Sequence, residues 1–158
     1  GMCVSTDLVK DAKDIHPTNK QDVGKRLAAI ALNNLYDKKM LCAGPSYRSM
    51  QVNGSEIAVS FNDTGSGLFV PDKYGYIKGF EIAGADSVFY FARAFIKDNA
   101  VILSCNKVSK PVAVRFGWMG DATECNLFNR EGFPAVPFRT DEWKTISKDK
   151  TYTIASFK

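Results

Sequence analysis

The sequence predicts a mainly β fold, an antiparallel β-sandwich preceded by a strand–helix segment with the character of an α/β domain. Two observations support this prediction. Between residues 45 and 118, apolar segments of four to eight residues rich in Val, Ile, Phe and Tyr alternate with turn signals. Before residue 40, apolar residues recur at helical spacing instead. We therefore divide the 158 residues into an α/β tail, 1–40, and a β-sandwich domain with an irregular C-terminal segment, 41–158.

The first 40 residues are predicted to form one short strand and one helix. Met2–Thr6 fits the strand, and the helix opens at Pro17 or Thr18, since proline suits a first helical turn, and runs to about Tyr36. Gly24 inside it predicts a closely packed neighbour. The apolar face consists of Val23, Leu27, Ile30, Ala31 and Leu35. Because one strand needs sheet partners, this segment is expected to be the tail of a larger domain.

Seven short strands are predicted in the sandwich. The first two, Ser49–Val52 and Glu56–Phe61, flank Asn53-Gly54, a strong hairpin signal. The other five follow a loop at residues 62–67 and are Ile77–Ala83, Ser87–Phe91, Ala94–Lys97, Ala100–Cys105 and Val112–Trp118. Short strands at this spacing are typical of an antiparallel sandwich.

The last 40 residues are predicted to be irregular up to a final strand. Pro134 and Pro137 disfavour a helix or a central strand. Thr151–Phe157 fits a last strand. No run of about 18 apolar residues occurs, so no membrane-spanning helix is predicted.

Composition argues against several classes of function. The net charge of +4 comes from 21 basic and 17 acidic residues that are scattered, which disfavours a nucleic-acid partner. Cys3, Cys42, Cys105 and Cys125 form no CxxC pair, and His16 is the sole histidine. Neither a metal site nor a disulfide framework is expected from this spacing, so free thiols and no cofactor are predicted.

His16 is the residue best suited to catalysis. It directly precedes the predicted helix, and Asp14 stands two residues earlier. A neutral imidazole is the usual base that activates a serine, and a nearby carboxylate orients it. In an extended segment, residues two apart point to the same side, so Asp14 can approach the ring. Alternatively, Asp14 caps the helix, and the histidine is a surface residue.

Residues 14–28 read D-I-H-P-x-N-K-x-x-V-G-x-R-L-A. Further blocks follow this one, up to Trp143: Gly44-Pro45, Ser49-Met50, residues 64–68, residues 79–86, residues 111–118, residues 126–129, Gly132, Pro134-Ala135 and residues 137–141. These blocks, in this order, resemble the sialate O-acetylesterase family, a branch of the SGNH hydrolases. The resemblance implies that residues 1–40 are the C-terminal tail of a truncated SGNH-type α/β esterase domain.

The resemblance also implies a reaction. Members of the family remove O-acetyl groups from sialic acids or related sugars, with a serine attacking the acetyl carbonyl and a histidine taking its proton. His16 stands where the family has that histidine, and Asp14 matches the adjacent acid. In the wider superfamily the acid stands three residues before the histidine, a position that Lys13 holds here. Periplasmic, secreted and lysosomal locations are all compatible with the resemblance.

The nucleophile and oxyanion hole of the superfamily lie well before the histidine, and we find no equivalent in this chain. Ser66, in Gly65-Ser66-Gly67, and Ser46, after Gly44-Pro45, lack the strand–turn–helix context of a nucleophile elbow. Asn62-Asp63 ends a predicted strand. The chain alone is thus expected to be inactive, with the N-terminal half of the esterase domain as its partner and an O-acetylated sugar or sialoside as substrate.

Two other interpretations stay open. The sandwich needs no nucleophile to act as a non-catalytic carbohydrate-binding module, or as a structural module that forms a homo-oligomer. Arg139 is a weak candidate for a substrate carboxylate, although an ion pair with Asp141 is favoured. Trp118, Trp143 and Phe138 could stack on sugars, but aromatic residues on strands are more often core residues.

Overall fold

The structure is a computed structural model that describes residues 1–14 and 16–145. Two four-stranded antiparallel sheets make up most of it. The first contains, in spatial order, β1 (Ser46–Asn53), β2 (Glu56–Asn62), β7 (Ala100–Ser104) and β6 (Arg93–Lys97). The second contains β10 (Phe138–Arg139), β8 (Ala113–Phe116), β4 (Phe80–Ala83) and β5 (Phe89–Phe91). The predicted mainly β class with antiparallel sheets is confirmed.

A third, two-stranded ladder closes one side of the sandwich. It pairs β3 (Leu68–Phe69) with β9 (Phe128–Asn129), which are far apart in the sequence. The sequence had predicted neither of these strands, nor β10. β10 follows Pro137 directly and lies at the edge of its sheet, where a missing N–H costs least.

The β1–β2 hairpin forms as predicted but turns one residue later. Asn53 pairs with Glu56, so the two central residues are Gly54 and Ser55 rather than Asn53 and Gly54. Gly54 has a φ of 63°, whereas Ser55 is not among the residues with positive φ. Glycine at the first central position with positive φ is the requirement of a type II′ turn.

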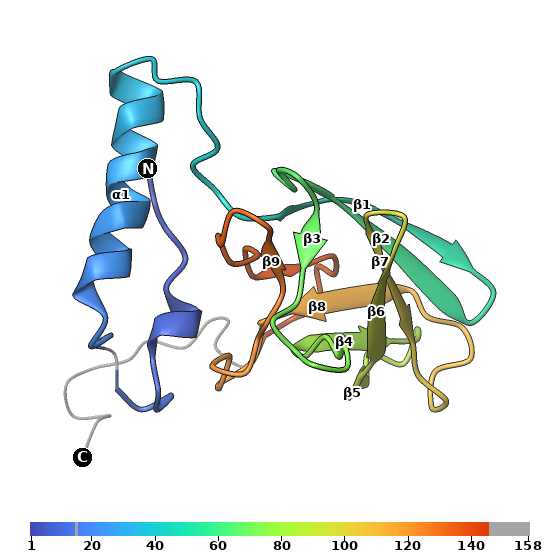
Figure 1. The fold of residues 1–158 in the computed structure, drawn as a ribbon. Helices are drawn as coiled ribbons and strands as arrows, with labels where there is room; N and C mark the ends of the chain where they lie inside the picture. Colours follow the sequence, from blue (N-terminus) through green and yellow to red (C-terminus); the bar gives the residue numbers. More distant parts are fainter. Residues whose placement is uncertain (15, 146–158) are drawn as a thin grey trace.

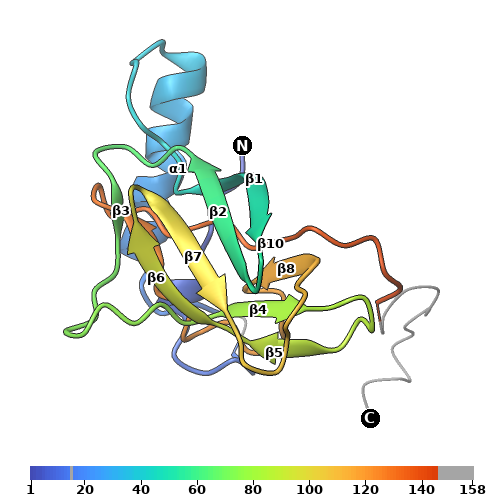
Figure 2. The same cartoon turned by 90° about the vertical axis from the view of Figure 1, so that its right-hand side faces the viewer.

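The core lies between the two sheets, whose strands cross in the view of Figure 2. Alternate residues of β2 and β7 point inward, with Ile57, Val59, Val101 and Leu103 fully buried. The second sheet contributes phenylalanines, and the rings of Phe80 and Phe116 are 4.6 Å apart. In β8, Val114 and Phe116 are buried and Arg115 is half-buried, but Ala113 is buried as well.

The N-terminal segment contains a turn where a strand was predicted. Met2–Thr6 forms no strand, and Thr6–Leu8 is a single 3₁₀ turn, η1. A strand at this place would need a sheet edge to pair with, and the segment instead runs along the helix (Figure 1). The buried guanidinium of Arg26 fixes it there, because Nη1 and Nη2 donate to the two Asp7 carboxylate oxygens at 2.7 and 2.6 Å.

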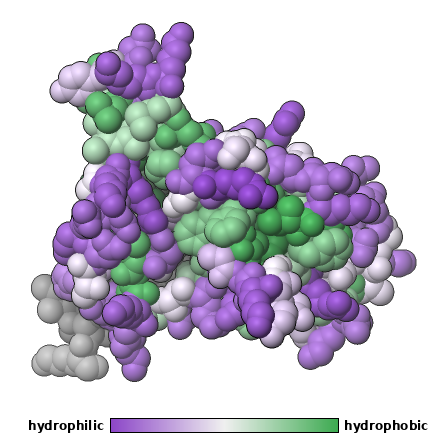
Figure 3. Space-filling view, in the orientation of Figure 1, coloured by the Kyte–Doolittle hydropathy of each residue, from purple (hydrophilic) through white to green (hydrophobic). Residues whose placement is uncertain are grey.

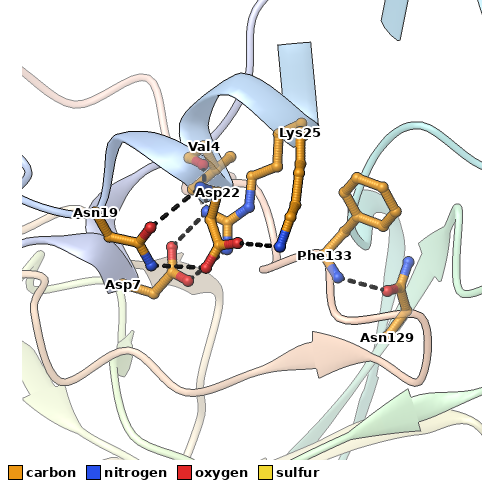
Figure 4. Close-up of polar contacts among 8 residues, drawn as sticks. Val4, Asp7, Asn19, Asp22, Lys25, Asn129 and Phe133 are labelled. Carbon is orange, nitrogen blue, oxygen red and sulfur yellow. Dashed lines mark hydrogen bonds and ion pairs between the residues drawn. The ribbon is translucent and has the colours of Figure 1, made fainter. Parts of the chain in front are cut away.

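Among the described residues, the one α-helix is α1 (Lys20–Leu35), which agrees closely with the predicted helix. Its N-cap is Asn19, whose side chain accepts from the N–H of Asp22 at 3.1 Å and donates to the Asp22 carboxylate (Figure 4). The side facing the rest of the chain carries Arg26 and Ala29, the buried residues of the helix.

Part of the predicted apolar face of α1 is exposed to solvent. Leu27 is 46% and Leu35 is 79% exposed, and apolar side chains are visible on the C-terminal half of the helix in Figure 3. A Cβ added to Gly24 would meet no atom within 4 Å, so the predicted close neighbour is not found among the described residues. The helix thus uses only one side for contacts within the described chain.

Residues 43–45 connect α1 to the sandwich and are held tightly. A Cβ on Gly44 would overlap the Pro134 carbonyl oxygen, so only glycine fits there. The buried Asn129 side chain donates to the carbonyls of Ala43 and Asp63 at 3.1 and 3.0 Å and accepts from the N–H of Phe133. No helix in the described residues is long and apolar enough to cross a membrane. The predicted strand Thr151–Phe157 lies outside the described residues.

Candidate functional site

The structure brings together the two predicted catalytic side chains, His16 and Asp14. Both lie in the loop before α1, and the backbone N–H of His16 donates to Asp14 Oδ1 at 2.8 Å. The imidazole Nδ1 lies 3.3 Å from the same oxygen. This separation lies within the range of an ion pair and slightly beyond the usual hydrogen-bond range of about 2.7–3.2 Å.

Asp14 does not cap α1. Asn19 fills the N-cap position, so the Asp14 carboxylate is left to the backbone and ring of His16. The backbone hydrogen bond holds the carboxylate on the Nδ1 side of the ring. The imidazole side chain is 80% exposed.

The two serines that resemble nucleophiles in sequence have other partners. Ser66 Oγ donates to Glu131 Oε1 at 2.7 Å, and Ser46 Oγ donates to Asp63 Oδ2 at 2.9 Å. These hydrogen bonds hold both serines in the sandwich, and each hydroxyl faces a carboxylate rather than the only imidazole of the chain. Neither serine has the base that an activated nucleophile requires.

Two neighbouring pockets share the loop that follows β8. The smaller pocket, about 300 Å³ in volume, is lined by Asp14 and η1 on one side and by Gly117, Met119 and Gly120 on the other. The larger, about 670 Å³, is lined by the same three loop residues together with aromatic side chains. One loop therefore borders both the predicted acid and an aromatic pocket.

The larger pocket lies on the outer face of the second sheet. Its aromatic lining is Phe89, Trp118 and Trp143, with the rings of Phe89 and Trp143 5.7 Å apart at 67°. Trp118 is 45% exposed, so the expectation that it is a core residue is wrong. Phe138 is buried in the core, as expected.

Arg115, rather than Arg139, is the main partner of Asp141. Nε and Nη2 of Arg115 donate to the two carboxylate oxygens, each at 2.8 Å, whereas the closest approach of Arg139 to Asp141 is 3.9 Å. These hydrogen bonds lower the pKa of the buried Asp141 carboxyl and raise the pKa of Arg115. Sequence reasoning had missed Arg115, although its outward position in β8 was a usable signal.

Arg139 is engaged inside the protein. Its Nη1 donates to the Trp143 carbonyl at 3.3 Å, and its guanidinium carbon lies 5.5 Å from the centre of the Trp118 ring. These contacts fit a residue that supports the aromatic pocket. The role of Arg139 toward a substrate carboxylate stays a prediction.

The described part of the chain contains free thiols but no cluster of metal-ligating side chains. No three His, Cys, Asp or Glu side chains there lie close enough to share a metal ion. All four cysteines are free. Burial, together with the nearby charges of Asp121 and Glu124, raises the pKa of the Cys125 thiol to about 11, which keeps it protonated and unreactive near neutral pH.

One solved structure is similar to this chain in sequence and fold. The chain is similar over 87% of its length to a crystal structure of a novel carbohydrate acetylesterase from Xanthomonas citri, with 41% sequence identity and a TM-score of 0.81. The similar region spans about 31% of that protein's chain. No protein-family model and no curated protein matches the sequence. The chain therefore resembles one part of a carbohydrate esterase in both sequence and fold.

Proposed function

We propose that this chain is the part of a carbohydrate O-acetylesterase that supplies the catalytic base. In this proposal His16 is the base, Asp14 orients its ring, and the serine nucleophile belongs to a segment that packs against α1. The observation that carries the proposal is the pairing of an exposed imidazole with a carboxylate 3.3 Å away. The similarity to a carbohydrate acetylesterase supports the reaction class.

The proposed reaction uses the two sides of the imidazole. Nε2 of His16 takes the proton of a serine hydroxyl as its oxygen attacks the acetyl carbonyl carbon. The imidazolium is stabilised by Asp14 on the Nδ1 side and returns the proton to the departing sugar oxygen. Water then attacks the acyl-serine, again with His16 as base, and acetate leaves. Backbone N–H groups that stabilise the oxyanion would come from the segment with the serine.

The exposed face of α1 is the proposed contact with that segment. Leu27 and Leu35 stand eight residues apart on one stripe, and Gly24 lies one turn before Leu27 with open space above it. Exposed leucines on an amphipathic helix favour a packing partner, since burying each one stabilises by about 1.5–3 kcal/mol. The Xanthomonas protein has about three times the length of the region matched here, which leaves ample chain for such a partner.

The sugar is a finer part of the proposal. Residues 14–28 resemble the sialate O-acetylesterases, and this resemblance favours O-acetylated sialic acid as the substrate. The neighbour is described more broadly as a carbohydrate acetylesterase. A panel that contains an O-acetylated sialoside and acetylated neutral oligosaccharides would separate the two classes by their rates of acetate release.

The experiment that tests the proposal compares the chain alone with a chimera. The chimera carries this chain in place of the corresponding region of the Xanthomonas acetylesterase. We expect no acetate release from the chain alone, because Ser66 and Ser46 are held by carboxylates, and acetate release from the chimera. A folded but inactive chimera would contradict the proposal and favour the non-catalytic carbohydrate-binding alternative. Activity of the chain alone would show that a nucleophile is present within it.

A further inference from the structure

We infer that the aromatic pocket on the outer face of the second sheet is a subsite for a neutral pyranose ring. The ring would belong to the glycan unit next to the one whose acetyl group reaches His16. The position relative to His16 rests on the proposed function, whereas binding of the sugar does not. The pocket is lined by Ser87, Phe89, Arg115, Trp118, Trp143 and the loop residues Gly117, Met119 and Gly120, among others.

Trp118 provides the surface on which a sugar ring would stack. Its side chain is 45% exposed and lines the pocket. A pyranose with equatorial hydroxyls has one apolar face of C–H groups, and an indole ring covers that face while the hydroxyls stay at the edge. Tryptophan suits such a wall because it combines a large apolar area with few rotatable bonds.

The wall is held in place before any ligand binds. The guanidinium carbon of Arg139 lies 5.5 Å from the centre of the Trp118 ring, and that of Arg115 lies 3.8 Å from the centre of the Phe89 ring. Trp143 meets Phe89 edge to face. A preformed wall of this kind lowers the entropy cost of binding.

The two arginines beside the pocket use their donors within the protein, which favours a neutral sugar over a carboxylated one. Both carboxylate oxygens of Asp141 accept hydrogen bonds from Arg115. The Nε and Nη2 donors of Arg115 are therefore already engaged. Arg139 donates to the Trp143 carbonyl. Glu81 lies opposite Arg115 in the register of β4 and β8, and its charge helps to raise the pKa of Arg115. An arginine that recognises a ligand carboxylate normally offers two parallel donors, and Arg115 uses such a pair within the protein.

The pocket also lies close to the proposed base. Gly117, Met119 and Gly120 line both this pocket and the smaller one that contains Asp14. A glycan whose acetylated unit reaches His16 would therefore extend over this loop and place a neighbouring unit at Trp118. Gly120 has no side chain, and a Cβ added there would meet no atom within 4 Å.

The test measures binding of unacetylated neutral sugars to the full 158-residue chain. Isothermal titration calorimetry with cellotetraose, xylotetraose and lactose is expected to give a dissociation constant in the millimolar range or tighter for at least one sugar. Trp118→Ala should weaken that binding by about tenfold or more, whereas Trp118→Phe should retain most of it. Tyr74→Ala is the matched control, because Tyr74 is 72% exposed but is absent from the pocket lining.

A second variant guards against a folding defect in Trp118→Ala. Gly120→Leu places a side chain in open space at the pocket and should weaken binding of the same sugar without lowering the melting temperature. Binding of none of the three sugars would overturn the proposal. So would unchanged binding in both pocket variants, or binding of 3′-sialyllactose at least about tenfold tighter than lactose.

Failure of the subsite and failure of the esterase proposal give different results. His16→Ala is expected to bind the sugar as the unchanged chain does, since the ligand carries no ester. If the chain binds the sugar but its chimera is inactive, the subsite is supported and the esterase role is rejected. An active chimera whose chain binds no sugar would reject the subsite alone.

Discussion

At the scale of single residues, Asn129 joins three parts of the chain. Its fully buried amide bonds the carbonyls of Ala43 and Asp63 and the N–H of Phe133. Asn129→Ala would leave these buried groups without partners, and we expect a loss of about 2–4 kcal/mol in the free energy of unfolding. Urea titration measures this loss. Asn62→Ala, at an exposed site at the end of β2, should cost far less, and an equal cost would contradict this role.

Asp141 makes the stability of the protein sensitive to acid. Hydrogen bonds from Arg115 lower the pKa of Asp141 in the folded state below its ordinary value of 3.8. This stabilisation is therefore fully present above 3.8 and is lost as the pH falls through the lowered folded-state pKa. Asp141→Asn should destabilise the protein at pH 7, in free energies of unfolding from urea titrations, and the difference from the unchanged protein should shrink in strong acid.

The neighbouring Glu142→Gln provides the control for Asp141, because Glu142 is exposed. It should change the free energy of unfolding little at any pH. A deficit of Asp141→Asn that stays constant from neutral to strongly acidic pH would show that the carboxylate charge has no part in the effect.

At the scale of elements, α1 carries a testable contact surface. Leu27→Ser together with Leu35→Ser should leave the melting temperature of the chain nearly unchanged, because both side chains are exposed in it. The same change should weaken association with the nucleophile-bearing remainder of the esterase, measured by co-purification of the two polypeptides. Gln21→Ser with Asn34→Ser, at exposed polar sites on the same helix, is the matched control.

Either of two results would contradict this role of α1. One is unchanged association in the leucine variant. The other is that the chain alone dimerises in analytical ultracentrifugation and that the leucine variant abolishes the dimer. That result would assign the surface to a second copy of the chain.

Helices and strands could be predicted from the sequence where a local residue pattern marks them. The β1–β2 hairpin follows from the Asn53-Gly54 signal between two apolar segments, and α1 follows from helical spacing. β3 and β9 have two residues each, and Leu68 pairs with Asn129 across a long stretch of chain, so no local pattern marks them. Met2–Thr6 has strand-like composition but no sheet edge to join, which composition cannot reveal.

At the scale of the whole molecule, the predictability of the site depends on sequence distance. The approach of Asp14 to His16 was predictable because the two residues are neighbours in the chain. The aromatic pocket was not, because it combines residues from β5, the loop after β8 and the segment after β10. Sequence distance also explains why the main partner of Asp141 was not predicted. Arg139 is closer to Asp141 in the sequence, but Arg115 on the adjacent strand makes the bidentate contact.

The arrangement of the molecule places a proposed base beside the sandwich. Asn129 and the Gly44–Pro134 approach fix the connection between α1 and the sheets, and the loop after β8 borders both the acid and the aromatic pocket. The sandwich would then position the glycan for the base. The division into residues 1–40 and 41–158 as separate domains stays a prediction.

The most direct test of the central claim is the rate of acetate release by the chimera with and without the imidazole of His16. We predict that His16→Ala lowers kcat by about 10³-fold or more, as loss of a catalytic base does. Lys13→Ala, which changes an exposed residue of the same loop, should leave the rate within about threefold of the unchanged chimera, well below the effect of losing a general base. A His16→Ala chimera that folds and releases acetate at the unchanged rate would contradict the assignment of His16 as the base.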